Sequence, residues 1–300
     1  MTPDWDDLRV FLAVVRAESL SGAGRLLKCD ASTVHRRISR LEGALNAQLF
    51  TKNPQGYSLT EVGARLLPHA ERIESACDGV AEVMNGQASG LTGQIRIGAP
   101  DGCANYLLPQ VVAQICDDNP GLDVQIIALP RVFNLSKREA DLVISVSRPE
   151  AGRITVQKLV DYQLHLAAHR DYLTRHGTPG DRSDLSQHRV IGYIPDMIFD
   201  KELDYLAESG ASAVHLASNS VAVQLNWLRA GSGIGIVHDF ALPFAPELVK
   251  VLPEHVHLTR TFWLIRHESD ARVERLNRFA TALTDGIRRE VARLEGATRA

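Results

Sequence analysis

Apolar residues recur at helical spacing close to the N-terminus of the chain. After Asp30, the residues Val34, Ile38, Leu41 and Leu45 follow one another at intervals of four, three and four. This spacing predicts a helix with one buried face. Asp30 is a residue type that often caps a helix, because its carboxylate accepts a hydrogen bond from a free backbone N–H. We therefore expect a helix to begin directly after it.

Two further helical patterns precede this helix, at residues 8–17 and 21–27, and a short turn at residues 28–30 leads into it. Three short helices with a tight turn before the third are typical of a helix-turn-helix. The next segment, residues 49–63, reads "LFTKNPQGYSLTEVG", with Asn-Pro and Gln-Gly between short extended runs. Such turn residues predict a β-hairpin. Together these patterns predict a winged helix-turn-helix.

The apolar spacing changes to a seven-residue repeat between residue 60 and about residue 87. The two repeating series are Leu66, Ile73 and Val80, and Ala70, Cys77 and Met84. Series of this kind form the seam along which two helices bury against each other, so we expect a dimerisation helix. The alternative is that this face packs on its own domain. Pro68 falls inside the predicted helix, where it lacks the N–H for a helical hydrogen bond.

Residues 85–93 are rich in Gly, Ser and Asn and predict a hinge. Beyond them, strand and helix patterns alternate. The first set comprises strands at residues 94–100, 122–129 and 140–147 and a helix at residues 106–119. The second set occupies residues 165–177, 188–194, 214–240 and 249–254, with a strand at 261–266 and a closing helix from 271 to about 294. This alternation predicts two α/β subdomains with parallel strands.

The expected fold class is therefore α/β with an N-terminal winged helix-turn-helix and a long linker helix. We place the winged helix-turn-helix at residues 1–59 and the linker helix and hinge at 60–89. The α/β part follows at residues 90–300. Within it, subdomain one is expected at about 90–160 and 266–300, and subdomain two at about 161–265.

The composition fits a globular protein with more than one domain. The chain has 300 residues, of which 45% are hydrophobic, and this is ample for two or three compact domains. The formal net charge of −3 gives no general attraction to nucleic acid, so such affinity must come from a local patch. Residues 28–52 form such a patch, because five basic residues there stand against two acidic ones.

Other composition features exclude several classes of protein. No apolar run approaches the roughly 20 residues that span a bilayer, and no export signal is evident, so we expect a cytoplasmic protein without membrane contact. The four cysteines, Cys29, Cys77, Cys103 and Cys116, lack metal-type spacing and are expected to be buried thiols. A thiol-sensor role for Cys103 is an alternative that we do not adopt. No metal site is expected, because the histidine pairs lack acidic or thiol partners at matching intervals.

Polar residues on the other faces of the helix after Asp30 are candidates for contact with nucleic acid. They are Ser32, Thr33, His35, Arg36, Arg37 and Arg40. Guanidinium groups bind phosphates, and hydroxyl and imidazole groups also suit base edges. The alternative is a solvated helix whose arginines only keep it soluble.

Candidate ligand contacts in the α/β part lie where strands lead into helices. Ligands of open α/β sheets bind beyond the carboxyl ends of the strands, where helix N-termini offer free N–H groups. Two such junctions are "APDGCANY", with Asp101, Gly102 and Cys103, and "LASNSVAV", with Asn219 and Ser220. Nearby strand ends add Arg131, Ser145, Ser147, Arg148 and His238. These hydroxyls and cations predict a small organic anion as the ligand, bound between the two α/β subdomains, and simple helix capping by the polar residues is the alternative.

The segments "FLAVVRAESLSGAGRLL", "STVHRRISRLEGAL", "QLFTK" and "GYSLTEVGARLLPHAERI" resemble the N-terminal domain of LysR-type transcriptional regulators. The segments "GQIRIGAPDG", "LLPQVVAQICDDNPGLDVQI", "READLVISVSRP" and "SNSVAVQLNWLRAGSGIGIV" resemble the effector domain of that family. Nearly the whole chain is covered. The resemblance implies a homodimer or homotetramer that binds double-stranded operator or promoter DNA and a small-molecule effector. RNA polymerase is a further candidate partner, and no cofactor is expected.

The resemblance also assigns positions at the DNA. It places the helix after Asp30 in the major groove, with Ala31, Ser32, Thr33, His35 and Arg36 at the DNA surface. His35 stands where the family often has serine, so the preferred bases are expected to differ. In the wing, Gln55 stands where arginine is frequent, which leaves Lys52 as the clearest phosphate contact.

Two other classes of protein are alternatives to a regulator. The two α/β subdomains resemble a periplasmic-binding-protein fold, but a solute-binding module has no use for "STVHRRISRL". An enzyme with an accessory winged helix would need a catalytic motif. The sequence has no Gly-x-Ser-x-Gly elbow and no P-loop, and "GSGIG" at residues 231–235 follows a predicted helix rather than a strand. We therefore expect a ligand-controlled transcription regulator and not an enzyme.

Overall fold

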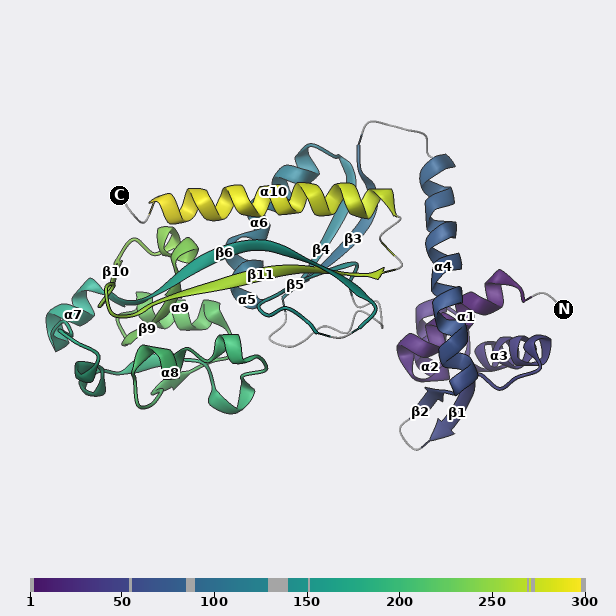
Figure 1. Cartoon of the computed structure of the whole chain (residues 1–300), viewed down its shortest axis with the longest axis horizontal. Helices are drawn as coiled ribbons and strands as arrows, with labels where there is room; N and C mark the ends of the chain where they lie inside the picture. The colour runs from purple at the N-terminus through teal and green to yellow at the C-terminus, as the bar shows by residue number, and fades with distance from the viewer. Residues whose placement is uncertain are drawn as a thin grey trace. The chain divides into compact units, whose positions relative to one another are not determined.

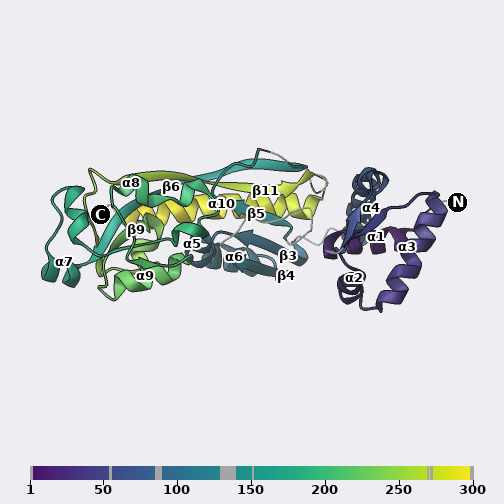
Figure 2. The ribbon, with the colours of Figure 1, turned by 90° about the horizontal axis from the view of Figure 1, so that it is seen from below.

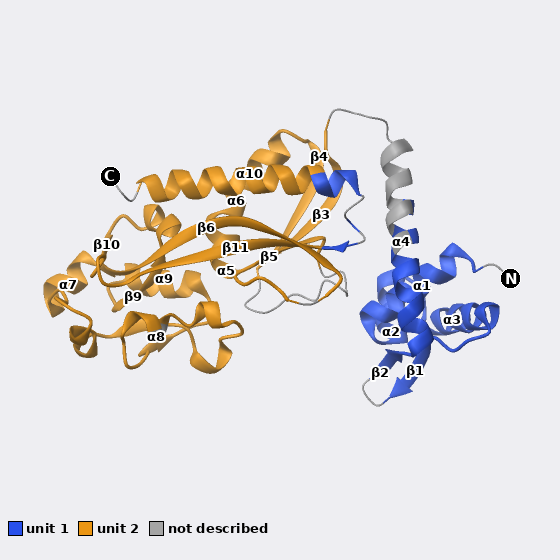
Figure 3. Cartoon of the chain, in the orientation of Figure 1, with its two compact units in different colours: residues 1–89, 134–139, 267–277 blue, residues 90–133, 140–266, 278–300 orange. Residues whose placement is uncertain are grey.

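The computed structural model describes residues 3–53, 56–84, 90–128, 140–150, 152–268, 270 and 273–297. The chain forms two compact units, which Figure 3 shows in different colours. The N-terminal unit comprises residues 1–89, 134–139 and 267–277, and the C-terminal unit comprises 90–133, 140–266 and 278–300. The domain and subdomain boundaries expected from the sequence stay predictions.

The N-terminal unit contains the predicted winged helix-turn-helix. Its elements are α1 (Trp5–Ala17), α2 (Leu20–Leu27), α3 (Ala31–Leu45), β1 (Phe50–Asn53), β2 (Gly56–Leu59) and α4 (Glu61–Met84) (Figure 1). Local chemistry starts each of the first three helices, because the side chains of Asp4, Ser19 and Asp30 accept hydrogen bonds from backbone N–H groups of the first turn. β1 and β2 pair as an antiparallel hairpin, which is the wing.

The turn between α2 and α3 depends on close backbone contact. Lys28 ends α2 in the left-handed conformation with φ of 55°, and Cys29 N donates to Gly24 O at 2.9 Å. A Cβ atom at Gly24 would lie 2.6 Å from the Cys29 carbonyl oxygen. Glycine is therefore needed at this position for the chain to turn so tightly into α3.

The N-terminal unit has its own apolar core, and part of the predicted seam of α4 belongs to it. Ala70 is fully buried in that core, and Leu66 packs against it. By contrast, Ile73 is 39% exposed and Cys77 is exposed. Val80 and Met84 lie outside the part of α4 whose side chains are described. The predicted seam is thus divided, because its first turns pack on their own unit and the next turn faces outward.

The turn before α3 offers a test of this packing. Gly24→Ala should destabilise the N-terminal unit by about 1–3 kcal/mol, because the added methyl group overlaps the Cys29 carbonyl. Gly43→Ala in α3 is the matched control, because no atom lies within 4 Å of its added methyl group. Alanine there should stabilise the helix by up to about 1 kcal/mol. Hydrogen exchange of the α3 amides should be faster in the first variant and slower in the second, and equal rates would contradict this account.

The C-terminal unit alternates strands and helices. Its helices of the α type are α5 (Asp101–Tyr106), α6 (Leu108–Asp117), α7 (Arg170–His176), α8 (Tyr205–Ser209), α9 (Val221–Arg229) and α10 (Glu274–Ala297). Its strands are β3 (Thr92–Ala99), β4 (Gly121–Ala128), β5 (Leu142–Ser145), β6 (Ile154–His169), β7 (Val190–Gly192), β8 (Leu216–Ala217), β9 (Ile234–His238), β10 (Leu248–Lys250) and β11 (His257–His267). Short 3₁₀ turns at Ser183–Gln187, Pro195–Met197, Lys201–Leu203 and Asp239–Phe244 complete the described part.

The described strands of the C-terminal unit form one mixed sheet, which corrects the prediction that the strands are parallel. Its order is β4-β3-β5-β11-β6-β9-β7-β8, with β10 paired to β6. β3 pairs in parallel with β4 and β5, and β7 with β8 and β9, but β11 is antiparallel to β5 and β6 is antiparallel to β9. Figures 1 and 2 show β6 and β11 side by side along the C-terminal unit. These two strands join its two α/β halves, which explains the antiparallel pairs.

Several element boundaries differ from the predictions. β3 begins at Thr92 instead of Gln94, and α5 lies where only a junction was expected. Most of β6 was not predicted, although apolar residues such as Ile154, Val156 and Tyr162 are spaced among polar ones in its first part. Its backbone is held from the side by α10, since Arg288 Nε donates to Leu159 O at 2.8 Å and Gln163 N donates to Glu295 Oε1 at 2.8 Å. Hydrogen bonds between β6 and α10 thus help to hold this strand in its position.

No helix in the described part of the chain is long and apolar enough to span a membrane.

Candidate nucleic-acid interface and effector cleft

Polar residues at the start of α3 form an N-terminal cap through hydrogen bonds to Asp30. Ser32 Oγ and Thr33 N donate to Asp30 Oδ1 at 2.6 and 2.7 Å, and Thr33 Oγ1 donates to Asp30 Oδ2 at 3.1 Å. These hydrogen bonds, with that of Ser32 the most effective, lower the pKa of Asp30 to about 2. The predicted hydroxyl contacts therefore have a structural role as well. Ser32 is exposed, and Ala31 and Thr33 are half-buried.

Further along α3, two of the predicted DNA contacts are exposed on the surface of the N-terminal unit. Arg36 has no hydrogen bond or ion pair with any residue that the structure describes. His35 lies next to Ser39, with 3.5 Å between Nδ1 and Oγ. The opposite face of the helix is buried in the core through Val34 and Ile38. This arrangement leaves the Arg36 guanidinium available for an external phosphate.

The other two arginines of α3 have internal partners. Arg40 donates from Nε and Nη2 to the two carboxylate oxygens of Asp7, each at 2.5 Å. The Asp7 side chain is only 3% exposed, so this ion pair holds α3 against α1. Arg37 lies 3.4 Å from Asp6 Oδ2 in a more exposed pair. Arg40 thus has a structural role through Nε and Nη2, and its predicted contact with DNA stays a prediction.

The wing lies beside α3 and shares a groove with it. The groove has a volume of about 380 Å³ and is lined by His35, Ser39, Thr51 and Lys52, among others. Lys52 is exposed on β1. The predicted contact Gln55 lies outside the described residues. Lys52 and the polar groups of α3 thus line one groove, as a nucleic-acid surface requires.

Two backbone anchors position this wing, and sequence reasoning missed both. Tyr57 N donates to Glu18 O at 2.9 Å, which holds β2 against the turn between α1 and α2. Glu42 Oε1 accepts from Leu49 N at 2.7 Å, which ties the end of α3 to the start of β1. A Glu near the end of a predicted helix, followed by a tight turn, is the signal that could have indicated the second anchor.

In the C-terminal unit, the two junctions predicted to face a ligand meet each other. Asp101 begins α5, and its Oδ2 accepts hydrogen bonds from Ser220 Oγ at 3.0 Å and from Ala222 N at 3.1 Å. Ser220 also caps α9, because its Oγ accepts from Val223 N at 3.4 Å. The carboxylate of Asp101 therefore occupies the N-terminus of α9, which is the position that favours a bound anion.

Three other predicted residues of this junction are buried. A Cβ atom at Gly102 would lie 3.2 Å from Cε1 of His238, so the missing side chain lets α5 approach that ring. Burial lowers the pKa of His238 to about 4, which keeps its ring neutral at pH 7, and the ring stacks on Tyr162. Cys103 is fully buried, and burial strongly raises the pKa of its thiol. This environment argues against a thiol-sensor role, because the reactive thiolate is disfavoured.

Of the remaining predicted contacts, Ser145 and Ser147 form a second group. Ser147 Oγ donates to Asp200 Oδ2, and Ser147 N donates to Ser145 Oγ at 3.4 Å. Arg148 is exposed, and its guanidinium lies 5.7 Å from the ring centre of Trp263. Asn219 is half-buried next to Ser220. Arg131 lies outside the described residues.

Sequence reasoning missed Asp200, which links this second group to the segment before α8. Asp200 Oδ1 also accepts from Glu202 N at 3.0 Å and so caps a short 3₁₀ turn. The pattern Asp-Lys-Glu-Leu, with a capping residue before a short helical turn, is the signal that could have pointed to it.

Histidines with ligand-like spacing have other partners. His165 Nδ1 lies 2.7 Å from Asp239 Oδ1, and Lys250 Nζ donates to Asp239 Oδ2 at 2.7 Å. His169 caps α7 by accepting from Asp171 N at 3.0 Å. Among the described residues, no group of three or more His, Cys, Asp or Glu side chains is arranged to hold a metal ion.

Comparison with protein families matches both units. The family model described as "Bacterial regulatory helix-turn-helix protein, lysR family" matches residues 5–64. A second family model, "LysR substrate binding domain", matches residues 88–288, which is more than half of the chain. The chain belongs to the LysR family of transcriptional regulators.

Individual relatives agree with this assignment. The chain is 26% identical over 276 residues to "HTH-type transcriptional activator TtdR" of Escherichia coli K12, covering 87% of this chain and 86% of TtdR. It is 26% identical over 235 residues to "HTH-type transcriptional activator AaeR" of the same strain, covering 77% of this chain and 75% of AaeR. The structure of CrgA, "a LysR-type transcriptional regulator from Neisseria meningitidis", has a TM-score of 0.59 and 23% identity, covering 96% of this chain and 99% of CrgA.

These matches confirm the resemblance and the fold class expected from the sequence. As a LysR-type regulator, the chain has a DNA-binding domain and an effector-binding domain, and members of the family are regulators rather than enzymes. The groove between α3 and the wing and the contact between α5 and α9 lie in these two domains, respectively.

Because the Arg36 guanidinium has no partner among the described residues, we expect it to contribute to DNA binding by this LysR-type regulator. Arg36→Ala should weaken binding to every duplex DNA, because a guanidinium on phosphate contributes charge without reading bases. The slope of log affinity against log salt concentration should fall by about 1. Fluorescence anisotropy with a selected operator and with random duplex DNA measures both effects.

The control for this experiment is Arg293→Ala in α10, where the side chain is 63% exposed and pairs with Glu290. It should leave both DNA affinities unchanged. Arg36 would instead be a base-reading residue if its variant lost discrimination between the two DNAs while nonspecific affinity and the salt slope were retained.

Proposed function

We propose that this LysR-type regulator binds operator DNA as a homodimer or homotetramer and responds to a small organic anion held between α5 and α9. The observation that carries the proposal is the meeting of the two predicted junctions at Asp101 and Ser220, with hydrogen bonds that span 119 positions of the sequence. A contact of this kind couples distant parts of the effector domain. The protein would act in the cytoplasm, with RNA polymerase as a further partner.

For DNA, we propose the exposed residues of α3 and the wing as the contact surface. Arg36 and Lys52 would bind phosphates, and His35 would face the bases of the major groove. Ala31, Ser32, Thr33, Arg37 and Gln55 complete the proposed surface. Arg40 is left out as a primary contact because its guanidinium is bonded to Asp7.

For the oligomer, we propose the outward-facing turn of α4 as an interface. Ile73 is one of few large apolar side chains exposed among the described residues, at 39%, and Cys77 follows it one turn later. Both belong to the seven-residue repeat, so a second copy of α4 would bury them.

Ile73→Asp should therefore dissociate this interface, because a charge would be buried in both copies without a counterion. Val62→Asp is the matched control, since Val62 is 43% exposed on the same helix but lies outside the repeat. Analytical ultracentrifugation of the full chain should show a smaller assembly only for the Ile73 variant. An unchanged assembly would place the interface elsewhere.

For the effector, the position of Asp101 determines how an anion would bind at the start of α9. The N–H groups at the start of α9 and the Ser220 hydroxyl suit a carboxylate, but Asp101 already binds them. An anionic effector would take the place of the Asp101 carboxylate, with Ser147 and Arg148 as further proposed contacts. Such a ligand shifts the protein between two arrangements only by the difference in its affinity for them.

Asp101→Asn provides the test, because the amide keeps the shape of the side chain and removes its charge. Carboxylate effectors identified by thermal shift on the full chain should bind the variant more tightly, by about fivefold for about 1 kcal/mol of relieved repulsion. Ser220→Ala should weaken the same binding, as measured by calorimetry. The anion proposal fails if the variant binds carboxylates less tightly, or if only cationic compounds bind to the wild type.

A further inference from the structure

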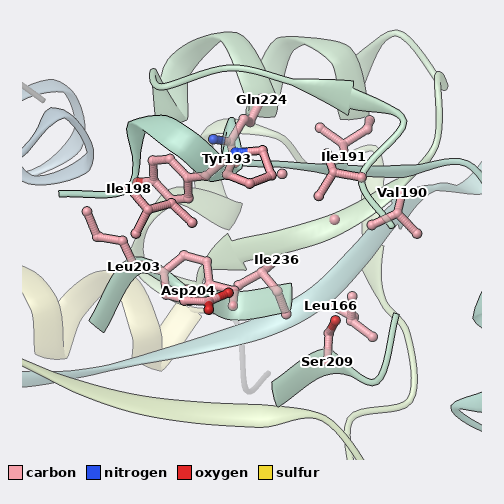
Figure 4. A pocket seen from close by; sticks show the side chains of 15 residues that line it. Leu166, Val190, Ile191, Tyr193, Ile198, Leu203, Asp204, Ser209, Gln224 and Ile236 are labelled. Carbon is pink, nitrogen blue, oxygen red and sulfur yellow. The ribbon is translucent and has the colours of Figure 1, made fainter. Parts of the chain in front are cut away.

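A cavity lies inside the C-terminal unit on one face of the sheet, and Asp101, Ser147 and Ser220 do not line it. Its volume is about 180 Å³. The floor consists of side chains from three strands, including Leu166 of β6, Ile191 of β7 and Ile236 of β9. Figure 4 shows these residues together with Ile198 and Leu203, which come from the segment between β7 and α8. The cavity is thus separate from the proposed effector contacts.

The lining indicates a mostly apolar ligand. Seven of the lining residues are Val, Leu or Ile, and none of the lining residues that the structure describes is Lys, Arg or His. Asp204, the only carboxylate among the lining residues, is exposed. A negatively charged molecule would find no counterion here and would be repelled by Asp204. The cavity therefore favours a neutral molecule, unlike the contacts at the start of α9.

The size and the aromatic side chains indicate a single ring. An apolar cavity of about 150 Å³ is known to hold benzene, so about 180 Å³ accommodates one ring with a small substituent. Tyr193 and Tyr205 both line the cavity, with ring centres 5.7 Å apart and an edge-to-face angle of 62°. Aromatic side chains in this geometry favour a further ring beside them.

Two polar groups of the lining favour a ligand with one hydroxyl. The Tyr205 hydroxyl is buried and has no hydrogen-bond partner among the described residues. Gln224 is 5% exposed, and its Nε2 donates to Ser218 O at 2.7 Å, which fixes the orientation of its amide. A buried polar group without a partner is unfavourable, and a ligand hydroxyl that reaches Tyr205 would remove this penalty.

We propose that this cavity is a second ligand site, which binds a small neutral phenol-type molecule independently of the anion site at Asp101. Phenol is the probe, and benzoate is its charged counterpart with the same ring. Calorimetry on the full-length protein should show phenol binding with one site per chain. Phenol should also bind equally well to Asp101→Asn, whose change lies outside the cavity.

Ile198→Phe is the main variant, because Ile198 is half-buried and its larger replacement would fill the cavity. Phenol should bind it more weakly by about tenfold or more, equal to at least about 1.4 kcal/mol. Met197→Phe is the matched control, since Met197 is the neighbouring residue, is 49% exposed and does not line the cavity. Its phenol affinity should equal that of the wild type.

Tyr205→Phe tests the hydroxyl without changing the size of the cavity. It should weaken phenol binding by about fivefold, which is the effect of one hydrogen bond, and leave toluene binding unchanged. The proposal is overturned if phenol does not bind the wild type, if Ile198→Phe and Met197→Phe bind it equally, or if benzoate competes with it for one site. Carboxylate binding should be unaffected by Ile198→Phe, so failure of this site and failure of the anion site are distinguishable.

Discussion

The carboxylate of Asp101 at the N-terminus of α9 joins the starts of α5 and α9 in the effector domain. A helix N-terminus offers free N–H groups and partial positive charge, and here the protein supplies its own anion to them, at 3.0 Å from Ser220 Oγ and 3.1 Å from Ala222 N. An acidic ligand at this position would compete with the Asp101 carboxylate, which is part of the protein itself. Its apparent affinity is therefore lowered by the fraction of molecules in which Asp101 is in place. Through the same competition, the proposed anionic ligand would change the contact between α5 and α9.

Internal charge pairing distinguishes the arginines of α3 that have partners within the protein from the one that we propose as a phosphate contact. Arg36 and Arg40 are both exposed arginines of one helix, but Arg40 binds the buried carboxylate of Asp7 through two hydrogen bonds. Loss of Arg40 would leave that carboxylate buried without a partner, which is strongly unfavourable. One arginine therefore positions the helix, and the other is left to interact outside the protein. A salt bridge at Arg16 and Glu74 similarly ties α1 to α4.

The sequence by itself determined the features that local chemistry controls. Asp30 capped the predicted helix and the apolar spacing of Val34, Ile38 and Leu41 defined its buried face, so α3 began and ended as expected. The hairpin and the linker helix also followed from local patterns, including Pro68 inside α4. The motifs were sufficient to assign the family, because they extend over both domains. The two strand-to-helix junctions were recognised as a potential site from the same kind of local signal.

Only the tertiary structure decided how these groups are paired. Sequence spacing cannot show that Asp101 meets Ser220, that Asp200 meets Ser147, or that Arg40 is bonded to Asp7, since each partner lies far away along the chain. It also could not show the path of β6, whose first part is held in the sheet by neighbouring strands and α10. The cavity beneath Ile198 arises from side chains of several separate segments. Local sequence determines which elements form, whereas long-range packing determines which polar groups are left available for a ligand.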